Sequence, residues 1–304
     1  MKKIEIICSI ILTILILAAP SCQKIETNNK PTIVVTYSIL GSIVNELVGD
    51  KADVIVSIPN GSDPHEWEPS AKSIEQINKA ALIIKNGLGL EEGMEKCLES
   101  AEKQGVKIFT ASDHINVRHV GLGEGIPSGD PDQAIGASDP HLWTDPVTMK
   151  AIVEALVPVL RQELKIDVSE KAKDLESLLT ELDKQISDRV SALPVEDRKL
   201  ITGHESMGYF AQRYNFKLIG VIVPSITSQA EVSAADLSEL KTTILNNHVK
   251  AIFAELGTSP STAKAIGNET GAQVVELITH NLPSDGSYFT FIRNLADTIV
   301  TALK

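Results

Sequence analysis

Hydrophobic and polar positions follow two alternating periods along this chain. Short apolar runs rich in β-branched residues, typical of buried strands, alternate with segments whose apolar residues recur at helical spacing. In the first half the runs that predict strands are 32–40, 52–59, 81–87 and 106–111. The helical patterns between them are 41–48, 70–79 and 91–104. This alternation predicts a mainly parallel sheet covered by helices on both faces.

The second half repeats the alternation after a long Gly-, Asp- and Pro-rich loop at 112–138. Its predicted strands are 198–202, 217–223, 249–256 and 272–279. Its predicted helices are 206–214, 234–247, 259–268 and 287–303. The fold class is therefore α/β, with two lobes that each contain a mostly parallel sheet flanked by helices.

A longer helical pattern lies between the two halves. Apolar residues recur at helical spacing from Ala172 to Leu193, and no Gly or Pro interrupts them before Pro194. Asp167 and Glu170 have the spacing of a capping box. We expect one helix of about 26 residues, roughly 39 Å long at 1.5 Å per residue, that joins the lobes as a stiff strut. The alternative is an ordinary packed helix.

These patterns divide the chain into consecutive segments. The N-terminal lobe is expected at 31–166, the linker helix at 167–193 and the C-terminal lobe at 194–304. Before them, Lys2 and Lys3 precede an apolar run at 6–19, which predicts a signal peptide at 1–21. A polar tether is expected at 22–30.

The signal peptide ends at small residues followed by Cys22, which resembles the site where a bacterial lipoprotein is cleaved and acylated. Ala19 stands where leucine is usual, and Pro20 departs from the pattern. We expect Cys22 to be lipidated, so that the protein is held outside the cytoplasm at the membrane, in the periplasm or on the cell surface. Secretion without a lipid and a retained anchor helix are the alternatives.

Cysteine content and charge narrow the function. Once the signal peptide is removed and Cys22 acylated, only Cys97 remains, so no intramolecular disulfide forms. Cys97 occupies an apolar position of a predicted helix and is expected in the core. The formal net charge of the full chain is −12. That balance argues against nucleic acid as a partner and is compatible with a cationic ligand.

Two similar motifs carry the first candidate chemistry. Residues 63–69 read Asp-Pro-His-Glu-Trp-Glu-Pro, and residues 139–146 read Asp-Pro-His-Leu-Trp-Thr-Asp-Pro. In each motif a histidine, His65 or His141, follows a proline and stands two residues before a tryptophan. Proline fixes its own φ and lacks an N–H, so both histidines are expected in turns. Two rigid loops that present histidines indicate one metal site shared by separate segments.

Two further histidines stand at the ends of predicted strands in the second half, His204 and His280. Ligands of open α/β sheets bind outside the carboxyl ends of the strands, where His65 and His141 are also expected. Several imidazoles make a nitrogen-rich tetrahedral site, which suits Zn²⁺. The remaining histidines are His248, expected to be structural, and His114 and His119, expected to be solvated or to bind metal weakly in the long loop.

A glycine-rich segment at 87–93 nearly matches a dinucleotide-binding fingerprint. Its third glycine comes one residue late, and Glu91 and Glu92 would face the phosphates. Their negative charge would repel a pyrophosphate. We interpret the segment as a tight turn between a strand and a helix.

Several motifs, taken in order, resemble the zinc- and manganese-binding receptors of bacterial ABC importers over most of the chain beyond the signal peptide. The matching segments are Pro64-His65 with Glu68-Pro69-Ser70, the run 86–91, the run 139–143 with Asp145-Pro146, His204 with Tyr209-Phe210, and the run 255–257. The resemblance implies two α/β lobes joined by one long helix, with one metal between them bound by His65, His141 and His204.

The fourth ligand departs from the pattern of that family, in which many members carry an aspartate after the last strand. Here His280 occupies the corresponding place in a shorter loop, and Asp285 is the alternative. An imidazole at His204, where a carboxylate would suit manganese, favours zinc. Zn²⁺ is therefore the expected ligand and Mn²⁺ the alternative.

The function that the resemblance implies is that of an extracytoplasmic receptor, not an enzyme. It would bind one metal ion in the cleft between the lobes and deliver it to an ABC permease, and we expect it to act as a monomer. Because the ligands must be neutral, capture is expected to weaken below about pH 6. The alternatives are a surface adhesin and a secreted zinc hydrolase with Glu66 or Glu205 as base, although His204-Glu205 lacks the second histidine of an H-E-x-x-H helix.

Overall fold

The computed structural model describes residues 30–121, 124, 135–228 and 231–304. The expected signal peptide, the tether up to residue 29 and Cys22 lie outside the described residues. Residues Pro31–Lys304 form one compact unit. Across the described ranges, no helix combines the length and the apolar character that a membrane crossing requires.

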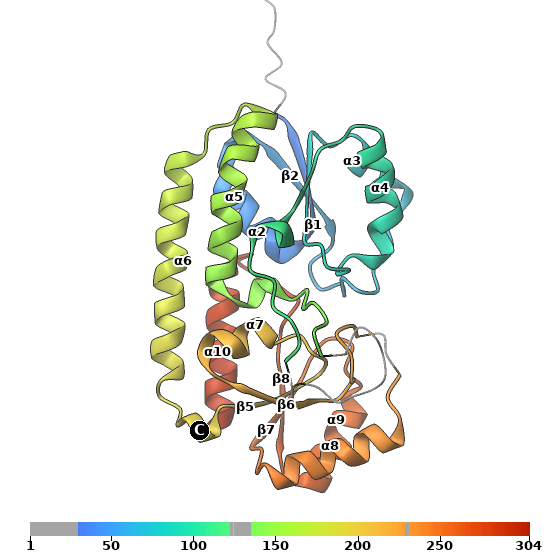
Figure 1. Cartoon of the computed structure of the whole chain (residues 1–304), viewed down its shortest axis with the longest axis vertical. Helices are drawn as coiled ribbons and strands as arrows, with labels where there is room; N and C mark the ends of the chain where they lie inside the picture. The colour runs from blue at the N-terminus through green and yellow to red at the C-terminus, as the bar shows by residue number, and fades with distance from the viewer. Residues whose placement is uncertain (1–29, 122–123, 125–134, 229–230) are drawn as a thin grey trace, which may run out of the picture. The chain divides into compact units, whose positions relative to one another are not determined.

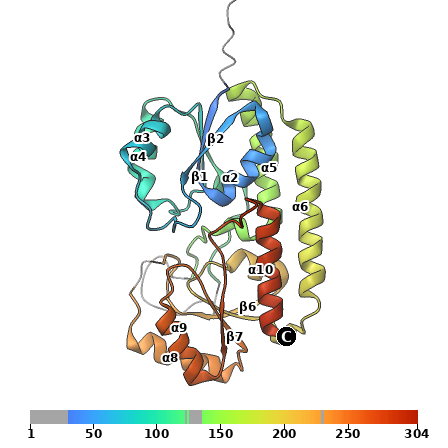
Figure 2. The ribbon, with the colours of Figure 1, turned by 180° about the vertical axis from the view of Figure 1, so that it is seen from behind.

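The N-terminal lobe contains a four-stranded sheet in the order β2-β1-β3-β4, with every pair parallel (Figures 1 and 2). Its strands are β1 (Thr32–Tyr37), β2 (Asp53–Ile58), β3 (Leu82–Lys85) and β4 (Ile108–Thr110). Its helices are α2 (Ser38–Val48), α3 (Ala71–Asn78), α4 (Glu95–Lys103) and α5 (Pro146–Leu164). From β1 the chain passes to β2 on one side of it, and from β2 it crosses to β3 on the other side. The strand order therefore reverses between β1 and β3, and open α/β sheets bind ligands at such a reversal.

Helix α5 is the element that the sequence patterns did not predict. Its buried residues, among them Met149, Ile152 and Leu160, do recur at helical spacing, but Pro158 stands inside the helix. Proline lacks the N–H that an interior helical position donates, so its presence argues against a helix through that point. The start of the helix does match sequence preferences, since Asp145 is the N-cap and Pro146 lies in the first turn.

The C-terminal lobe has four parallel strands, but they are hydrogen-bonded as two separate pairs, β5-β6 and β7-β8. The strands are β5 (Lys199–Thr202), β6 (Lys217–Val221), β7 (Ala251–Ala254) and β8 (Gln273–Glu276). The helices are α7 (Gly208–Tyr214), α8 (Ala234–Asn246), α9 (Pro260–Thr270) and α10 (Tyr288–Leu303). Strands β5 and β7 lie side by side, and beyond their ends the Glu255 carboxylate accepts a hydrogen bond from the Gly203 N–H. The Glu255 side chain thus joins the segments after β5 and β7, which no backbone hydrogen bonds between these two strands connect.

Five short 3₁₀ turns complete the described secondary structure. They are Gly49–Lys51, Glu92–Met94, Ala111–His114, Leu142–Thr144 and Val195–Asp197. The predicted helix at 91–104 therefore begins as a 3₁₀ turn and continues as α4.

The long helix between the lobes is α6 (Ser169–Val190), which has 22 residues and a length of about 33 Å. It packs against α5 of the N-terminal lobe and α10 of the C-terminal lobe (Figures 1 and 2). The predicted capping box is wrong: Asp167 instead accepts hydrogen bonds from the N–H and hydroxyl of Ser169 and from Arg161. The helix consequently starts two residues later than expected, without a side-chain cap.

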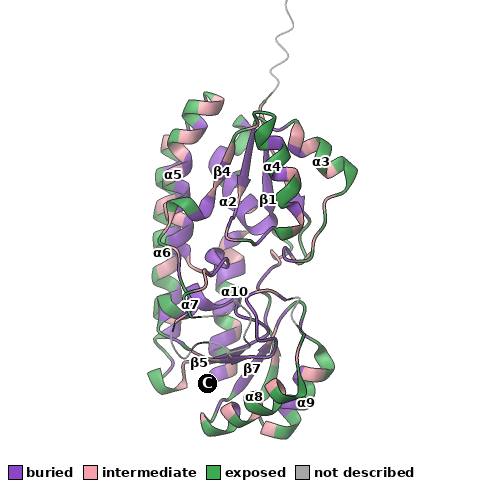
Figure 3. Cartoon of the chain, turned by 45° about the vertical axis from the view of Figure 1, so that its right-hand side comes forward, coloured by how far each residue is buried: buried purple, intermediate pink, exposed green. Residues whose placement is uncertain are grey.

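Buried residues run through both lobes and the helices beside them (Figure 3). The apolar ones form one continuous cluster that both lobes share. It contains residues from the first sheet such as Ile33, from α6 such as Leu179, and from the second lobe such as Leu200. A smaller cluster lies under α8 and α9. A wide hinge motion would expose part of the shared core to water, so the packing favours small displacements of the lobes.

Candidate metal centre

The two Asp-Pro-His motifs form the same kind of turn. The Asp63 carboxylate accepts a hydrogen bond from the His65 N–H at 3.0 Å, and the Asp139 carboxylate accepts one from the His141 N–H at 2.9 Å. An aspartate that bonds the backbone two residues on closes an Asx turn. The repeated motif therefore fixes the backbone of both histidines, and the prediction that they lie in turns is confirmed.

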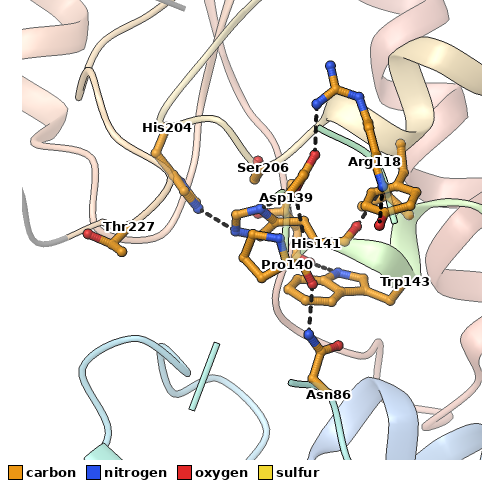
Figure 4. A network of polar contacts seen from close by, with 12 residues as sticks. Asn86, Arg118, Asp139, Pro140, His141, Trp143, His204, Ser206 and Thr227 are labelled. Carbon is orange, nitrogen blue, oxygen red and sulfur yellow. Dashed lines mark hydrogen bonds and ion pairs between the residues drawn. The ribbon is translucent and has the colours of Figure 1, made fainter. Parts of the chain in front are cut away.

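The structure brings His65, His141, His204 and His280 together. One ring nitrogen from each lies within 4.8 Å of the others, and all four side chains are buried. The Nε2 atom of His141 is 3.2 Å from Nε2 of His65 and 3.2 Å from Nε2 of His204. Figure 4 shows the His141 and His204 rings pointing toward one another.

Each histidine reaches this point from the end of a different strand or loop. His65 follows β2, His141 follows the loop after β4, His204 follows β5 and His280 follows β8. The first two belong to the N-terminal lobe and the last two to the C-terminal lobe. The cluster thus lies at the carboxyl ends of strands from both lobes, as the strand positions predicted.

The other candidate residues lie elsewhere. His114, His119 and His248 are exposed, and none belongs to the cluster. The His114 ring stacks on Phe109 with centroids 4.5 Å apart. Asp285, the alternative fourth ligand, is exposed before α10, where its carboxylate accepts hydrogen bonds from the Ser287 N–H at 3.0 Å and the Thr290 hydroxyl at 2.8 Å. The structure therefore places His280, and not Asp285, beside the other three histidines.

The His141 ring is held by a carboxylate on the side away from the cluster. Its Nδ1 is 2.9 Å from Asp139, whose other oxygen accepts a hydrogen bond from Arg118 (Figure 4). A charged carboxylate accepts the Nδ1 proton, so the Nε2 lone pair faces the other histidines. Because Asp139 is paired with buried Arg118, the ring orientation is fixed before any ligand arrives.

Burial disfavours the protonated form of three of these histidines, His65, His204 and His280. It lowers the pKa of His65 to about 3, and the neighbouring His141 adds to the effect. It also lowers the pKa of His280 to about 3. The pKa of His204 is well below its usual value, again mainly through burial. Neutral imidazoles with inward lone pairs are the form in which histidine binds metal.

The wall beside the cluster is built from Trp143 of the second motif. This side chain is fully buried, and its indole N–H donates to the Thr279 carbonyl at 2.8 Å. The Tyr288 hydroxyl in turn donates to the Trp143 carbonyl at 2.9 Å, and the Tyr37 ring packs on the indole. These contacts tie the loop of His141 to the loop of His280.

Sequence reasoning did not assign a role to two acidic residues next to the cluster, Asp139 and Glu255. Glu255 is buried, accepts hydrogen bonds from the hydroxyls of Ser206 and Thr279, and lies 3.6 Å from His204 Nδ1. The position of Asp139, two residues before His141, was the one signal in the sequence for its contact with that ring. For Glu255, no spacing along the chain indicated the contact, since the strands that bring it there are far apart in sequence.

The glycine-rich segment that resembles a phosphate loop is filled by its own glutamate. The buried Glu91 carboxylate accepts hydrogen bonds from the N–H groups of Asn86 and Gly87 and from the Thr36 hydroxyl. These are the amides that a phosphate would need. Gly87 has φ of +88°, and a Cβ there would stand 2.4 Å from the Ser112 hydroxyl oxygen. The segment is a tight turn, as predicted.

A two-lobed α/β fold with a buried histidine cluster at the inner strand ends defines a metal-binding receptor of the substrate-binding type. The chain belongs to the family described as zinc-uptake complex component A, periplasmic, whose sequence profile matches residues 33–302. The resemblance noted from the motifs is therefore confirmed.

Individual relatives carry names for both metals. The manganese-binding lipoprotein MntA of Halalkalibacterium halodurans is 25% identical over the whole of both chains. The high-affinity zinc uptake system protein ZnuA of Bacillus subtilis is 31% identical over 83% of this chain and 79% of its own length. Among solved structures, the periplasmic zinc-binding protein TroA of Treponema pallidum superposes with a TM-score of 0.73 at 25% identity, covering 90% of this chain and 99% of TroA.

Proposed function

We propose that this protein is an extracytoplasmic receptor that binds one Zn²⁺ ion through His65, His141, His204 and His280 and delivers it to an ABC permease. The observation that carries the proposal is the convergence of four buried imidazoles from both lobes. Four nitrogen donors that lie within 4.8 Å of one another match the number of ligands that Zn²⁺ prefers in a tetrahedral site. Membership of a family of metal-ion receptors supports the transport role.

The choice of zinc over manganese rests on the donor atoms. Mn²⁺ favours carboxylate, carbonyl and water oxygens, whereas Zn²⁺ binds well to imidazole nitrogen. No carboxylate belongs to the ligand cluster found in the described residues. The relatives include receptors named for either metal, so family membership alone leaves the metal open.

Purified metal-free protein should take up one Zn²⁺ per chain and bind it at least about 100-fold more tightly than Mn²⁺, as the order of divalent metal affinities predicts. Metal analysis after gel filtration would give the stoichiometry, and titration against a chelator of known affinity would give both dissociation constants. Equal affinity for the two metals, or two tight sites per chain, would contradict the assignment.

A receptor fits this centre better than a hydrolase does. Catalytic zinc keeps one coordination position open for water and needs a general base nearby. Four histidine ligands would fill a tetrahedral site. Of the two candidate bases, Glu66 is exposed, whereas Glu205 is buried and burial raises its pKa to about 7. The receptor is therefore favoured by the four histidine donors, and not by the lack of a base.

Metal binding would act on the loops more than on the lobes. The shared core opposes wide hinge closure, while the loop of His65 is joined to the C-terminal lobe by a hydrogen bond of 2.6 Å from the Ser228 hydroxyl to Asp63. A metal ion bound by histidines from both lobes would order these loops and tilt one lobe slightly. The permease would recognise the resulting surface.

The proposed organisation of the whole chain follows the sequence. We assign 1–21 to a signal peptide, 22–30 to a tether, 31–166 and 194–304 to the lobes, and 167–193 to the linker region. The protein is proposed to act as a monomer held to the membrane by acylated Cys22. The lipoprotein names of relatives such as MntA support the anchor.

Replacing Cys22 by serine should release the protein from the membrane fraction or leave its precursor uncleaved, because no thiol remains to carry the lipid. Stable anchoring needs more than one acyl chain, which a bacterial lipoprotein normally provides. Fractionation with immunoblotting would measure the change, and Cys97→Ser is the matched control that should stay at the membrane. A mature wild-type protein that begins at an unmodified residue other than Cys22 would contradict the proposal.

A further inference from the structure

Thr279 stands between a buried carboxylate and the ring of His280. Its hydroxyl oxygen is 2.8 Å from Glu255 Oε2 and 2.9 Å from His280 Nδ1. All three side chains are buried. The threonine thus connects the buried carboxylate of Glu255 to the ring of His280.

The direction of these hydrogen bonds follows from the partners of Glu255. Its carboxylate accepts from the Gly203 N–H at 2.9 Å, from the Ser206 hydroxyl and from the Thr279 hydroxyl. A hydroxyl has one proton to donate. Since Thr279 donates that proton to Glu255, its oxygen can only accept from the imidazole. The proton of neutral His280 must therefore be on Nδ1.

The other nitrogen of His280 is then the one that carries a lone pair. This Nε2 atom is buried and has no hydrogen-bond partner among the residues that the structure describes. The His280 ring lies nearly parallel to that of His204, with centroids 5.4 Å apart. An unprotonated, unpartnered nitrogen beside three other imidazoles has the chemistry of a metal ligand.

The backbone of Thr279 is fixed as well as its side chain. Its carbonyl accepts the indole N–H of Trp143, which is fully buried. The residue is therefore held from the N-terminal lobe through its carbonyl and from the C-terminal lobe through its hydroxyl. Rotation of the hydroxyl away from His280 would break its hydrogen bond to Glu255.

We propose that Thr279 is a positioning residue. Its hydroxyl donates to Glu255 and accepts the Nδ1 proton of His280, which leaves His280 Nε2 unprotonated and facing the metal. The inference rests on the proposed function of the four histidines as one metal site. Glu255 Oε2 also lies 3.6 Å from Nδ1 of His204, which is beyond hydrogen-bond distance, so its hydrogen-bonded link is to His280. In the N-terminal lobe, Asp139 instead contacts His141 Nδ1 directly, at 2.9 Å, without an intervening hydroxyl.

The assignment predicts different results for two conservative substitutions. Thr279→Val keeps the branched shape but removes the hydroxyl, whereas Thr279→Ser keeps the hydroxyl. The valine variant should bind zinc about 10- to 100-fold more weakly, which is the usual cost of losing a group that orients a metal-binding histidine. The serine variant should bind within a few-fold of the wild type.

Nitrogen-15 NMR of the metal-free protein, with histidine labelled in the ring, provides a measurement independent of metal. The wild type and Thr279→Ser should show His280 protonated at Nδ1, and Thr279→Val should show a mixture with the Nε2-protonated form. Chelator competition on the same samples would give the zinc affinities. Thr279→Ala removes the hydroxyl without placing a second methyl group against Glu255, and serves if the valine variant does not fold.

The outcomes separate this inference from the proposed function. Wild-type protein that binds zinc tightly, together with a folded Thr279→Val or Thr279→Ala variant of unchanged affinity and unchanged His280 tautomer, would overturn the role of Thr279 alone. Wild-type protein that fails to bind zinc would overturn the proposed function. Weaker zinc binding with a changed tautomer, restored by serine, would support the inference.

Discussion

His141→Ala should weaken zinc binding by at least about 100-fold, more than the loss of a group that merely orients a ligand. The Nε2 atom of His141 lies 3.2 Å from the corresponding atoms of both His65 and His204, which places it centrally in the cluster. Alanine would remove one nitrogen donor and leave the fully buried Asp139–Arg118 pair without its imidazole partner. Calorimetric titration by competition with a chelator would measure the loss. His65→Ala and His204→Ala should behave similarly.

Two control substitutions make this prediction specific. His248→Ala should leave zinc affinity unchanged, because this exposed residue is outside the cluster. At the fourth position, His280→Ala should weaken zinc binding, whereas Asp285→Ala should mainly lower the stability of the metal-free protein. The Asp285 carboxylate accepts hydrogen bonds from the Ser287 N–H and the Thr290 hydroxyl at the start of α10. Equal losses of affinity at His248 and His141, or a larger loss at Asp285 than at His280, would contradict the ligand assignment.

Metal-free protein should lose stability steeply as the pH falls below about 6.5. His65 and His280 have pKa values of about 3 in the folded protein, and that of His204 is also low, while an unfolded histidine titrates near 6.5. Between these values the unfolded chain binds protons that the folded chain does not, so acid favours unfolding. The loss of stability per pH unit increases with the number of histidines that are protonated only in the unfolded chain.

Urea unfolding of chelator-treated protein at pH 7.5, 6.5 and 5.5 would measure this dependence. The stabilisation from neutral histidines should be fully present above about pH 6.5 and decline toward pH 3. His280→Ala, which lacks one of the three groups, should give a shallower dependence. A free energy of unfolding that stays constant from pH 7.5 to 5.5 would contradict the pKa values. Because these three imidazoles resist protonation, zinc capture should persist to a lower pH than the value near 6 expected from sequence.

Most of the fold could be predicted from local patterns. All eight predicted strands are present. Short runs of β-branched residues bounded by turn residues rarely form anything other than strands in an α/β chain. Helix α5 was missed because Pro158 argues against a helix when only local sequence is considered, although tertiary packing tolerates it. The capping interaction of Asp167 was misjudged because a neighbouring serine and Arg161 compete for its carboxylate.

The candidate site could be predicted in its main residues but not in its supporting groups. Four histidines at strand ends were recognisable, since parallel strands bring their carboxyl ends to one edge. The contact from Glu255 through Thr279 to His280 depends on the pairing of β7 with β8, which brings the residues beyond the ends of these two strands together. That arrangement is set by tertiary packing, so no spacing along the chain reveals it.

Helix α10 has a consequence for how the chain reaches its folded state. It packs on α6 and also on α2, and the Ser42 hydroxyl donates to the Gly286 carbonyl and accepts from the Tyr288 N–H. These partners are more than 240 residues apart in sequence. The N-terminal lobe is thus completed by one of the last segments to be synthesised, and contacts of such long range form slowly. The fold is therefore completed only after the last segment of the chain has been synthesised.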